Sequence, residues 1–184
     1  MSDRREPSWI EDAKRLDLAV YSAIASTPTP ELDAAMSRLS RAADYSRLSL
    51  ASAALLALAG GRRGRRAAAK GLASLGVTAT VVNVVVKPLG RRHRPDRVGS
   101  DVPLARHVPM PTTRSFPSGH SASAFAFATG VGHVMPAAGV PLRALAALVA
   151  YSRIHTGVHY PGDVLAGALM GTALAQVTTK LLDR

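Results

Sequence analysis

Long stretches of the chain carry no charged residue, and clusters of arginine and lysine separate them. The uncharged runs cover residues 48–61, 71–86, 115–142, 144–152 and 164–179. A helix on the surface of a soluble protein needs a charged face, which these runs lack. Most are shorter than the roughly 18 apolar residues of an independent membrane span, but basic side chains at their ends can snorkel to the lipid headgroups. The pattern predicts membrane helices at residues 45–61, 67–88, 118–136, 141–153 and 162–181.

The chain before residue 45 follows a different pattern. Residues 8–26 and 31–43 place apolar side chains at helical spacing among charged ones, and Pro28 and Pro30 separate the two segments. We expect two amphipathic helices, which either lie on the bilayer surface or pack against the membrane helices. Residues 1–17 have no apolar stretch after a basic start, so a cleavable signal peptide is not predicted.

The length of 184 residues suits a single domain. We expect an all-α fold, a polytopic transmembrane helical bundle of about five to six membrane helices with amphipathic N-terminal helices. Within the domain of residues 1–184, residues 1–44 form the amphipathic part and residues 45–181 the membrane core. A soluble bundle with buried helices is the alternative that hydropathy leaves open.

The chain is strongly basic. Lysine and arginine outnumber the acidic residues by 23 to 12, a formal net charge of +11, which favours nucleic acid, anionic lipid or a phosphorylated substrate as partner. With 47% hydrophobic residues the chain is too apolar for a disordered polycation. Its lack of cysteine excludes disulfides, iron–sulfur clusters and a thiol nucleophile. Any covalent chemistry must use other side chains.

If each predicted membrane helix crosses the bilayer once, the polar loops fall on two faces. Residues 87–117 and 152–162 lie on one face, with the start of the first helix. Residues 62–66 and 136–141 lie on the other face, with the C-terminus. Arginines crowd residues 62–66, and the positive-inside rule places such a loop in the cytoplasm. The first face, which carries the reactive side chains, is then extracytoplasmic.

Two clusters on this face suit an anion. Lys87 and Arg94 stand at the exit of a helix that two prolines end, so both cations can face one anion. Ser118, Gly119 and His120 open the next long helix. Ser118 is a good N-cap, and the free amides and dipole of a helix N-terminus attract phosphate.

A third cluster suits nucleophilic attack. Arg153 ends one helix, and His159 and Asp163 bracket the start of the next. An aspartate four residues after a histidine can hold the imidazole tautomer and leave the other nitrogen free to attack. A metal site of His155, His159 and Asp163 is an alternative, although Pro161 and Gly162 interrupt the helix that would align the three ligands.

Phosphoryl transfer needs cations around the equatorial oxygens, a nucleophile and a proton for the leaving oxygen. This inventory matches all three needs. The motifs are Lys87-x6-Arg94-Pro95, Pro117-Ser118-Gly119-His120 and Ser152-Arg153-x5-His159-x3-Asp163. In order, spacing and placement at helix ends they resemble the three motifs of the type 2 phosphatidic acid phosphatase (PAP2) superfamily.

The resemblance implies a role for each motif residue. His159 would attack phosphorus to give a phosphohistidine, Asp163 would orient His159, and His120 would protonate the leaving alcohol. The phosphoryl oxygens would be held by Lys87, Arg94, Ser118, Gly119 and Arg153. The resemblance implies neither a metal nor another cofactor. Arg91, Arg92 and Arg97 lie outside the motifs, and we expect them to be snorkelling anchors or contacts to lipid headgroups.

The function expected from motifs and hydropathy is an integral membrane phosphatase of the cell membrane that acts on a lipid phosphate or diphosphate within the bilayer. A polyprenyl phosphate is favoured over phosphatidic acid or phosphatidylglycerophosphate, and no nucleic-acid partner is expected. Two alternatives remain. A basic membrane-anchored protein that binds nucleic acid or anionic lipid would explain the charge. A transporter would explain polar groups among helices, but its site is expected near mid-membrane rather than at helix ends.

Overall fold

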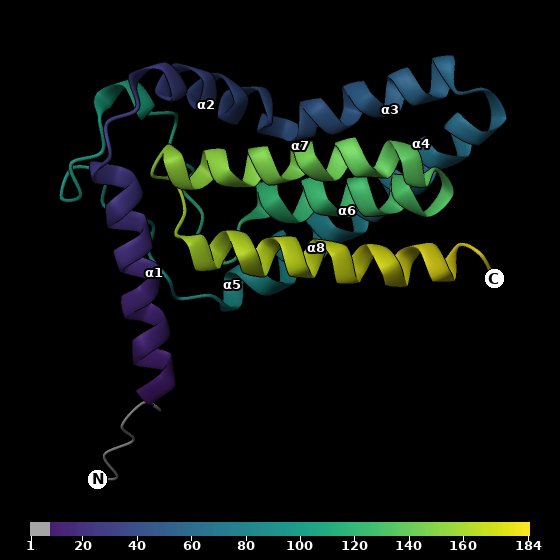
Figure 1. Cartoon of the computed structure of the whole chain (residues 1–184). Helices are drawn as coiled ribbons and strands as arrows, with labels where there is room; N and C mark the ends of the chain where they lie inside the picture. Colours follow the sequence, from purple (N-terminus) through teal and green to yellow (C-terminus); the bar gives the residue numbers. More distant parts are fainter. Residues whose placement is uncertain (1–7) are drawn as a thin grey trace, which may run out of the picture.

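The helices of the core run side by side along one direction (Figure 1). The structure is a computed structural model that describes residues 8–184, so the predictions for residues 1–7 lie outside the described residues. The core consists of α3 (Arg47–Ala59), α4 (Gly61–Thr80), α6 (Gly119–Val134), α7 (Pro136–His155) and α8 (Pro161–Leu181). No strand occurs in the described range, and the predicted all-α fold is confirmed.

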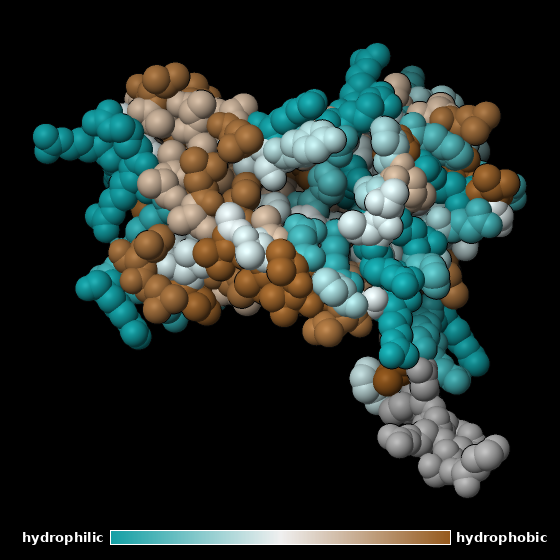
Figure 2. Space-filling view, turned by 180° about the vertical axis from the view of Figure 1, so that it is seen from behind, coloured by the Kyte–Doolittle hydropathy of each residue, from teal (hydrophilic) through white to brown (hydrophobic). Residues whose placement is uncertain are grey.

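Three stretches are long and apolar enough to cross a membrane, namely Gly61–Leu89, Pro136–His155 and Pro161–Leu181. The other two predicted spans are shorter, because α3 has 13 residues and α6 has 16. A helix of 16 residues is about 24 Å long, less than the roughly 30 Å hydrocarbon core. Figure 2 shows a hydrophobic band over the bundle with hydrophilic residues towards both ends, the distribution expected of a membrane protein.

The short helix α6 occupies the middle of the bundle and contacts α4, α7 and α8. Small residues allow these close contacts: a Cβ at Gly171 of α8 would collide with the carbonyl of Ala122 in α6. Phe127 and Val131 of α6 fill the buried core against alanines of α3 and α4. Because its neighbours cover it, α6 holds its N-terminus in a fixed place at one end of the bundle.

The stretch Gly61–Leu89 is not a uniform α-helix. Its residues Val81–Val86 form a π-helical turn, η2, which is followed by the short α5 (Lys87–Leu89). A π-helical turn holds an extra residue and changes the direction in which the following side chains point. Lys87 comes directly after it and is buried, with 9% of its surface exposed.

The two predicted N-terminal helices are present as α1 (Ser8–Ser26) and α2 (Pro30–Ala42). Helix α1 crosses the end of the bundle at a steep angle, whereas α2 lies along α7 and nearly in line with α3 (Figure 1). Trp9 and Leu16 of α1 are 68% and 66% exposed, but α2 buries Met36 and Ser40. Of the two predicted arrangements, α2 therefore adopts packing against the bundle.

Candidate active site

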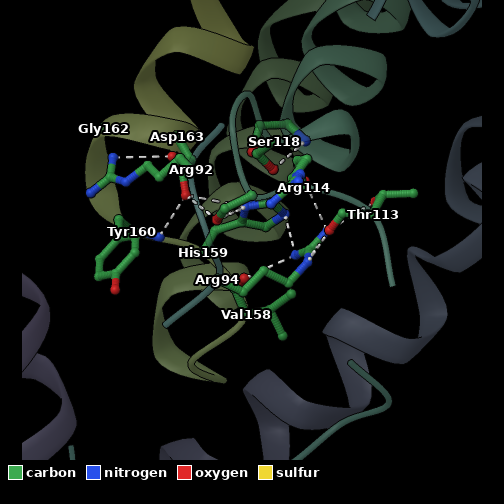
Figure 3. Close-up of polar contacts among 12 residues, drawn as sticks. Arg92, Arg94, Thr113, Arg114, Ser118, Val158, His159, Tyr160, Gly162 and Asp163 are labelled. Atoms are coloured by element: carbon green, nitrogen blue, oxygen red, sulfur yellow. Dashed lines mark hydrogen bonds and ion pairs between the residues drawn. The ribbon is translucent and has the colours of Figure 1, made fainter. Parts of the chain in front are cut away.

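The three motifs meet at the end of the bundle where α1 lies. Arg94 reaches across to His159 in the loop between α7 and α8 (Figure 3), with its Nη1 3.1 Å from the imidazole Nε2. His159 is almost fully buried, with 1% of its surface exposed. The nitrogen Nε2 therefore faces the basic pocket rather than the bulk solvent.

The other imidazole nitrogen of His159 faces a carboxylate. Asp163 Oδ2 lies 3.5 Å from Nδ1, and the Ser115 hydroxyl lies 3.4 Å from the same nitrogen and donates to Asp163 Oδ2 at 2.5 Å. These partners favour the tautomer with the proton on Nδ1 and the lone pair on Nε2. Burial lowers the pKa of His159 to about 4, against the opposing effect of the Asp163 hydrogen bond. The imidazole is thus neutral at neutral pH and able to act as a nucleophile.

Neutral oxygens hold Arg94 and Lys87 in place. Arg94 donates from Nε to the carbonyl of Thr113 at 2.8 Å and from Nη1 to the carbonyl of Val158 at 3.0 Å. Lys87 Nζ donates to the Thr113 hydroxyl at 3.3 Å. Because none of these partners is a carboxylate, the two side chains are oriented while their positive charge stays available to an anion.

Arg153 completes the group of cations from the end of α7 and is 1% exposed. Its Nη1 donates to the Ser40 hydroxyl at 2.6 Å and lies 3.7 Å from Asp44 Oδ1. Its Nε has no hydrogen-bond partner among residues 8–184. A buried N–H of this kind is costly unless a ligand accepts it, so Arg153 has hydrogen-bonding capacity for a bound anion.

The N-terminus of α6 supplies the remaining predicted residues. Ser118 is the N-cap, as predicted: its Oγ lies 3.4 Å from the amide of Ser121 and accepts a hydrogen bond from that residue's hydroxyl at 2.9 Å. A Cβ at Gly119 would lie 3.4 Å from Lys87 Nζ, so the glycine keeps room between helix and cation. His120, Gly119 and Lys87 line a cavity of about 200 Å³ that opens between α3, η2 and α6.

The expectation for Arg92 is wrong. We expected a lipid-facing anchor, but Arg92 Nη1 donates to Asp163 Oδ1 at 3.1 Å, and its Nη2 pairs with Asp17 of α1. Its guanidinium also lies 4.1 Å from the centre of the Tyr160 ring. The motif spacing carried no signal for this role, because the partners come from separate elements. Arg92 instead links α1 to the carboxylate beside His159.

The three ligands of the alternative metal site do not converge. His155 Nε2 lies 2.8 Å from Asp33 of α2, whereas His159 faces Asp163. Over residues 8–184, no group of three or more histidine, aspartate or glutamate side chains is arranged to hold a metal ion. The sequence carried no signal for two further contacts to the predicted catalytic residues. Ser115 contacts Asp163, and Asp44 contacts His120.

Comparison with known proteins agrees with this geometry. Residues 67–184 match the family model described as PAP2 superfamily. A decaprenylphosphoryl-5-phosphoribose phosphatase of Mycobacterium tuberculosis is 39% identical over 100 residues, 54% of this chain and 52% of that protein. A lipid A 1-phosphatase of Rhizobium johnstonii is 31% identical over 109 residues, 56% of this chain and 43% of that protein. The chain thus spans about half the length of the curated relatives it matches.

Solved structures share the fold. LpxE of Aquifex aeolicus superposes with a TM-score of 0.73 at 28% identity, over 90% of this chain and 95% of that chain. The transmembrane PAP2-type phosphatidylglycerolphosphate phosphatase of Bacillus subtilis has a TM-score of 0.70 at 23% identity, over 94% of this chain and 87% of that chain. Together with the three helices long enough to cross a bilayer, these likenesses identify an integral membrane protein.

Proposed function

Because the chain belongs to the PAP2 superfamily, we propose that it is a membrane phosphatase that hydrolyses a lipid phosphate or diphosphate through a phosphohistidine. The observation that carries this proposal is the position of His159, whose Nε2 lies 3.1 Å from Arg94 while its Nδ1 faces Asp163. This arrangement combines an aimed, neutral nucleophile with a cation that can bind the phosphoryl group.

In the first half of the reaction, the Nε2 lone pair of His159 attacks phosphorus. The bond between phosphorus and the lipid oxygen breaks, and His120 gives its proton to that oxygen, so the lipid leaves as an alcohol or as a lipid monophosphate. Lys87, Arg94 and Arg153 stabilise the charge on the equatorial oxygens, with help from the α6 N-terminus at Ser118 and Gly119. Asp163 stabilises the imidazole ring as it becomes positively charged.

In the second half, water attacks the phosphohistidine. His120, now neutral, accepts a proton from the water as its oxygen bonds to phosphorus, and the phosphorus–nitrogen bond breaks. Inorganic phosphate leaves, while His159 regains its lone pair and His120 its proton. The protein's own cations supply the positive charge throughout, so the proposed reaction requires no metal.

We favour polyprenyl-linked phosphates as substrates. One relative is the decaprenylphosphoryl-5-phosphoribose phosphatase described above, and an undecaprenyl-diphosphatase of Sulfolobus acidocaldarius is 36% identical over 77 residues. The cavity beside His120 adjoins a smaller, apolar one between α3, α6 and α7. The two share the lining residues Leu48, Ser49, Ala124 and Val149. This path supports a lipid whose tail stays in the bilayer while its head enters the site.

A substrate panel tests the proposal. The purified full chain in detergent, with excess chelator, receives a polyprenyl phosphate, a polyprenyl diphosphate, phosphatidic acid and phosphatidylglycerophosphate, and released inorganic phosphate is measured for each. We expect release without added metal, fastest from a polyprenyl substrate. Activity that appears only with a divalent metal, or binding without release, would contradict the proposal.

We place the active site on the extracytoplasmic face of the cell membrane, because the arginines of residues 62–66 lie at the opposite end of the bundle from His159. The half-buried Ser100, in the loop on the active-site side, offers a labelling position. A cysteine introduced by Ser100→Cys should react in intact cells with an impermeant thiol reagent. Protection until the cells are lysed would reverse the assignment.

A further inference from the structure

His120 has a carboxylate partner that lies outside all three motifs. Asp44 Oδ1 lies 3.0 Å from His120 Nε2, although 76 residues separate the two in the sequence. Asp44 begins η1 (Asp44–Ser46), the short turn between α2 and α3. Both side chains are partly exposed, 32% for Asp44 and 25% for His120. His120 lines the cavity that would receive the substrate, and so do Ala43 and Tyr45, the two neighbours of Asp44 in the chain.

The backbone after Asp44 is strained. Tyr45 and Ser46 have φ angles of 55° and 57°, the left-handed region that non-glycine residues avoid. Non-glycine residues adopt this conformation only at an energetic cost, and strain of this kind is concentrated at functional sites. Here it turns the chain sharply between two helices and leaves Asp44 facing the start of α6.

The surroundings of His120 oppose its protonation. A general acid must hold a proton before it can give one, yet burial disfavours the charged imidazole most strongly, and Arg153, Lys87 and Arg94 add positive charge nearby. Among residues 8–184, Asp44 is the carboxylate within hydrogen-bonding distance of His120, and the same Oδ1 also lies 3.7 Å from Arg153 Nη1. An adjacent carboxylate stabilises an imidazolium by direct attraction.

We propose that Asp44 is the positioning residue of His120: it accepts the Nε2 hydrogen, stabilises the imidazolium and leaves Nδ1–H to protonate the leaving oxygen. Nδ1 of His120 makes no hydrogen bond to the protein within residues 8–184. The site then contains two pairs of the same design, because Asp163 orients the nucleophile His159 and Asp44 orients the acid His120. This inference rests on the proposed phosphatase function and adds a residue to it.

The leaving group separates this role from a structural one. A lipid alcohol needs a proton as it leaves, whereas p-nitrophenolate leaves readily without one. Asp44→Asn should therefore slow phosphate release from a polyprenyl phosphate by about 100-fold, the lower range for general acid catalysis. The pre-steady-state burst of p-nitrophenol from p-nitrophenyl phosphate should change by less than about 3-fold, because the phosphate pocket and His159 stay intact.

Four further variants sharpen the test. His120→Asn should show the same dependence on leaving group, and the double variant should be little slower than either single one, since the residues act as a unit. Asp44→Glu should recover part of the activity. Asp12→Asn, a change to an exposed carboxylate on α1, serves as the matched control and should behave as wild type. Vanadate affinity reports whether the pocket of each variant is intact.

The outcomes are distinct. Equal losses on both substrates would show that Asp44 acts through Arg153 or the fold, and unchanged rates on both would show that it has no role; either result overturns the inference. If wild-type protein releases phosphate from neither substrate, the proposed function fails and this inference fails with it. A loss confined to the lipid substrate supports both.

Discussion

Both ends of the bundle carry clusters of basic side chains, but the groups that pair with these side chains differ. At the active end, neutral groups hold Arg94 and Lys87: the carbonyls of Thr113 and Val158 and a hydroxyl. At the opposite end, three basic side chains pair with the carboxylate of Asp183: Lys70, Arg66 at 3.3 Å and His133 at 2.7 Å. The hydrogen bonds from Lys70 and His133 lower the pKa of Asp183 to about 2.

This difference suggests a general way to recognise an anion site. A carboxylate partner orients a cation and also cancels its charge, whereas a carbonyl orients it and leaves the charge in place. Basic clusters at helix ends are common in membrane proteins because they anchor the bilayer surface. The neutral partners of Arg94 and Lys87 leave these two cations available to a phosphate. The division is not strict, since Arg92 at the active end pairs with carboxylates and Arg63 at the other end donates to a carbonyl.

The largest effect is expected for His159→Ala, which should abolish phosphate release but leave anion binding intact. His159→Ala removes the nucleophile and should lower kcat for phosphate release by about 10⁴-fold or more, as loss of a catalytic nucleophile does in other enzymes. Competitive inhibition by vanadate should persist, because the cations remain. Turnover within 10-fold of wild type would remove His159 from the mechanism.

Arg94 provides the next test. Arg94→Ala should lower kcat/KM by roughly 10²–10³-fold, the loss expected for a donor aimed at the transition-state oxygens. Arg94→Lys keeps the charge but not the planar fork and should recover only part of the rate. Arg63→Ala is the matched control: Arg63 also donates to a carbonyl, that of Val134 at 3.1 Å, but at the opposite end. An equal loss of kcat/KM in Arg94→Ala and Arg63→Ala would contradict the assignment of phosphate binding to one end of the bundle.

The pKa of His159 gives a direct spectroscopic prediction. With a pKa of about 4, His159 remains mostly neutral at pH 5.5. An ordinary histidine at that pH is about 90% protonated, so the protonated fractions differ about thirty-fold. Nitrogen NMR of labelled histidines measures the protonated fraction of His159, with His159→Gln to assign its signal.

The lowered pKa of His159 also predicts that stability depends on pH. Because the unfolded chain takes up the proton first, the free energy of unfolding should fall as pH drops from about 6.5 through 4. Titration of His159 near 6.5 would contradict its burial.

The smallest effects compare one ion pair at each end. Arg92→Met removes the contact to Asp163 Oδ1 and should lower kcat about 10-fold with little change in KM, the equivalent of about 1.4 kcal/mol. Asp183→Asn removes the centre of the opposite cluster and should leave kcat/KM unchanged. Parallel kinetics on one lipid phosphate measure both, and a drop for Asp183→Asn would mean that the two ends are coupled.

Much of the fold follows from the sequence, because uncharged runs and prolines define helices locally. The predicted helix at residues 8–26 matches α1, and each segment predicted to cross the bilayer overlaps a core helix. Helices α4 and α7 begin earlier than predicted, at Gly61 and Pro136, in stretches predicted to be loops. The lengths of α3 and α6 were overestimated. Uncharged loop residues at their ends look the same as membrane residues in a hydropathy pattern, and only packing shows where each helix stops.

The site was predictable where spacing along the chain carries the information. The motif residues lie at helix ends, so their order and separation already bring Lys87, Arg94 and His159 towards one face. Arg92 and Asp44 were not predictable in this way. Their partners lie 71 and 76 residues away, on elements whose contacts depend on how the whole bundle packs.

The π-helical turn Val81–Val86 makes the position of Lys87, the predicted phosphate-binding lysine, depend on the number of residues before it. Each residue of a helix advances the side-chain direction by about 100°, so a deletion of one residue in this turn would swing Lys87 away from the pocket without altering any motif letter. A homologue that keeps the lysine but has one residue fewer before it would retain the signature and lose the geometry. The spacing upstream of the first motif is therefore part of the site.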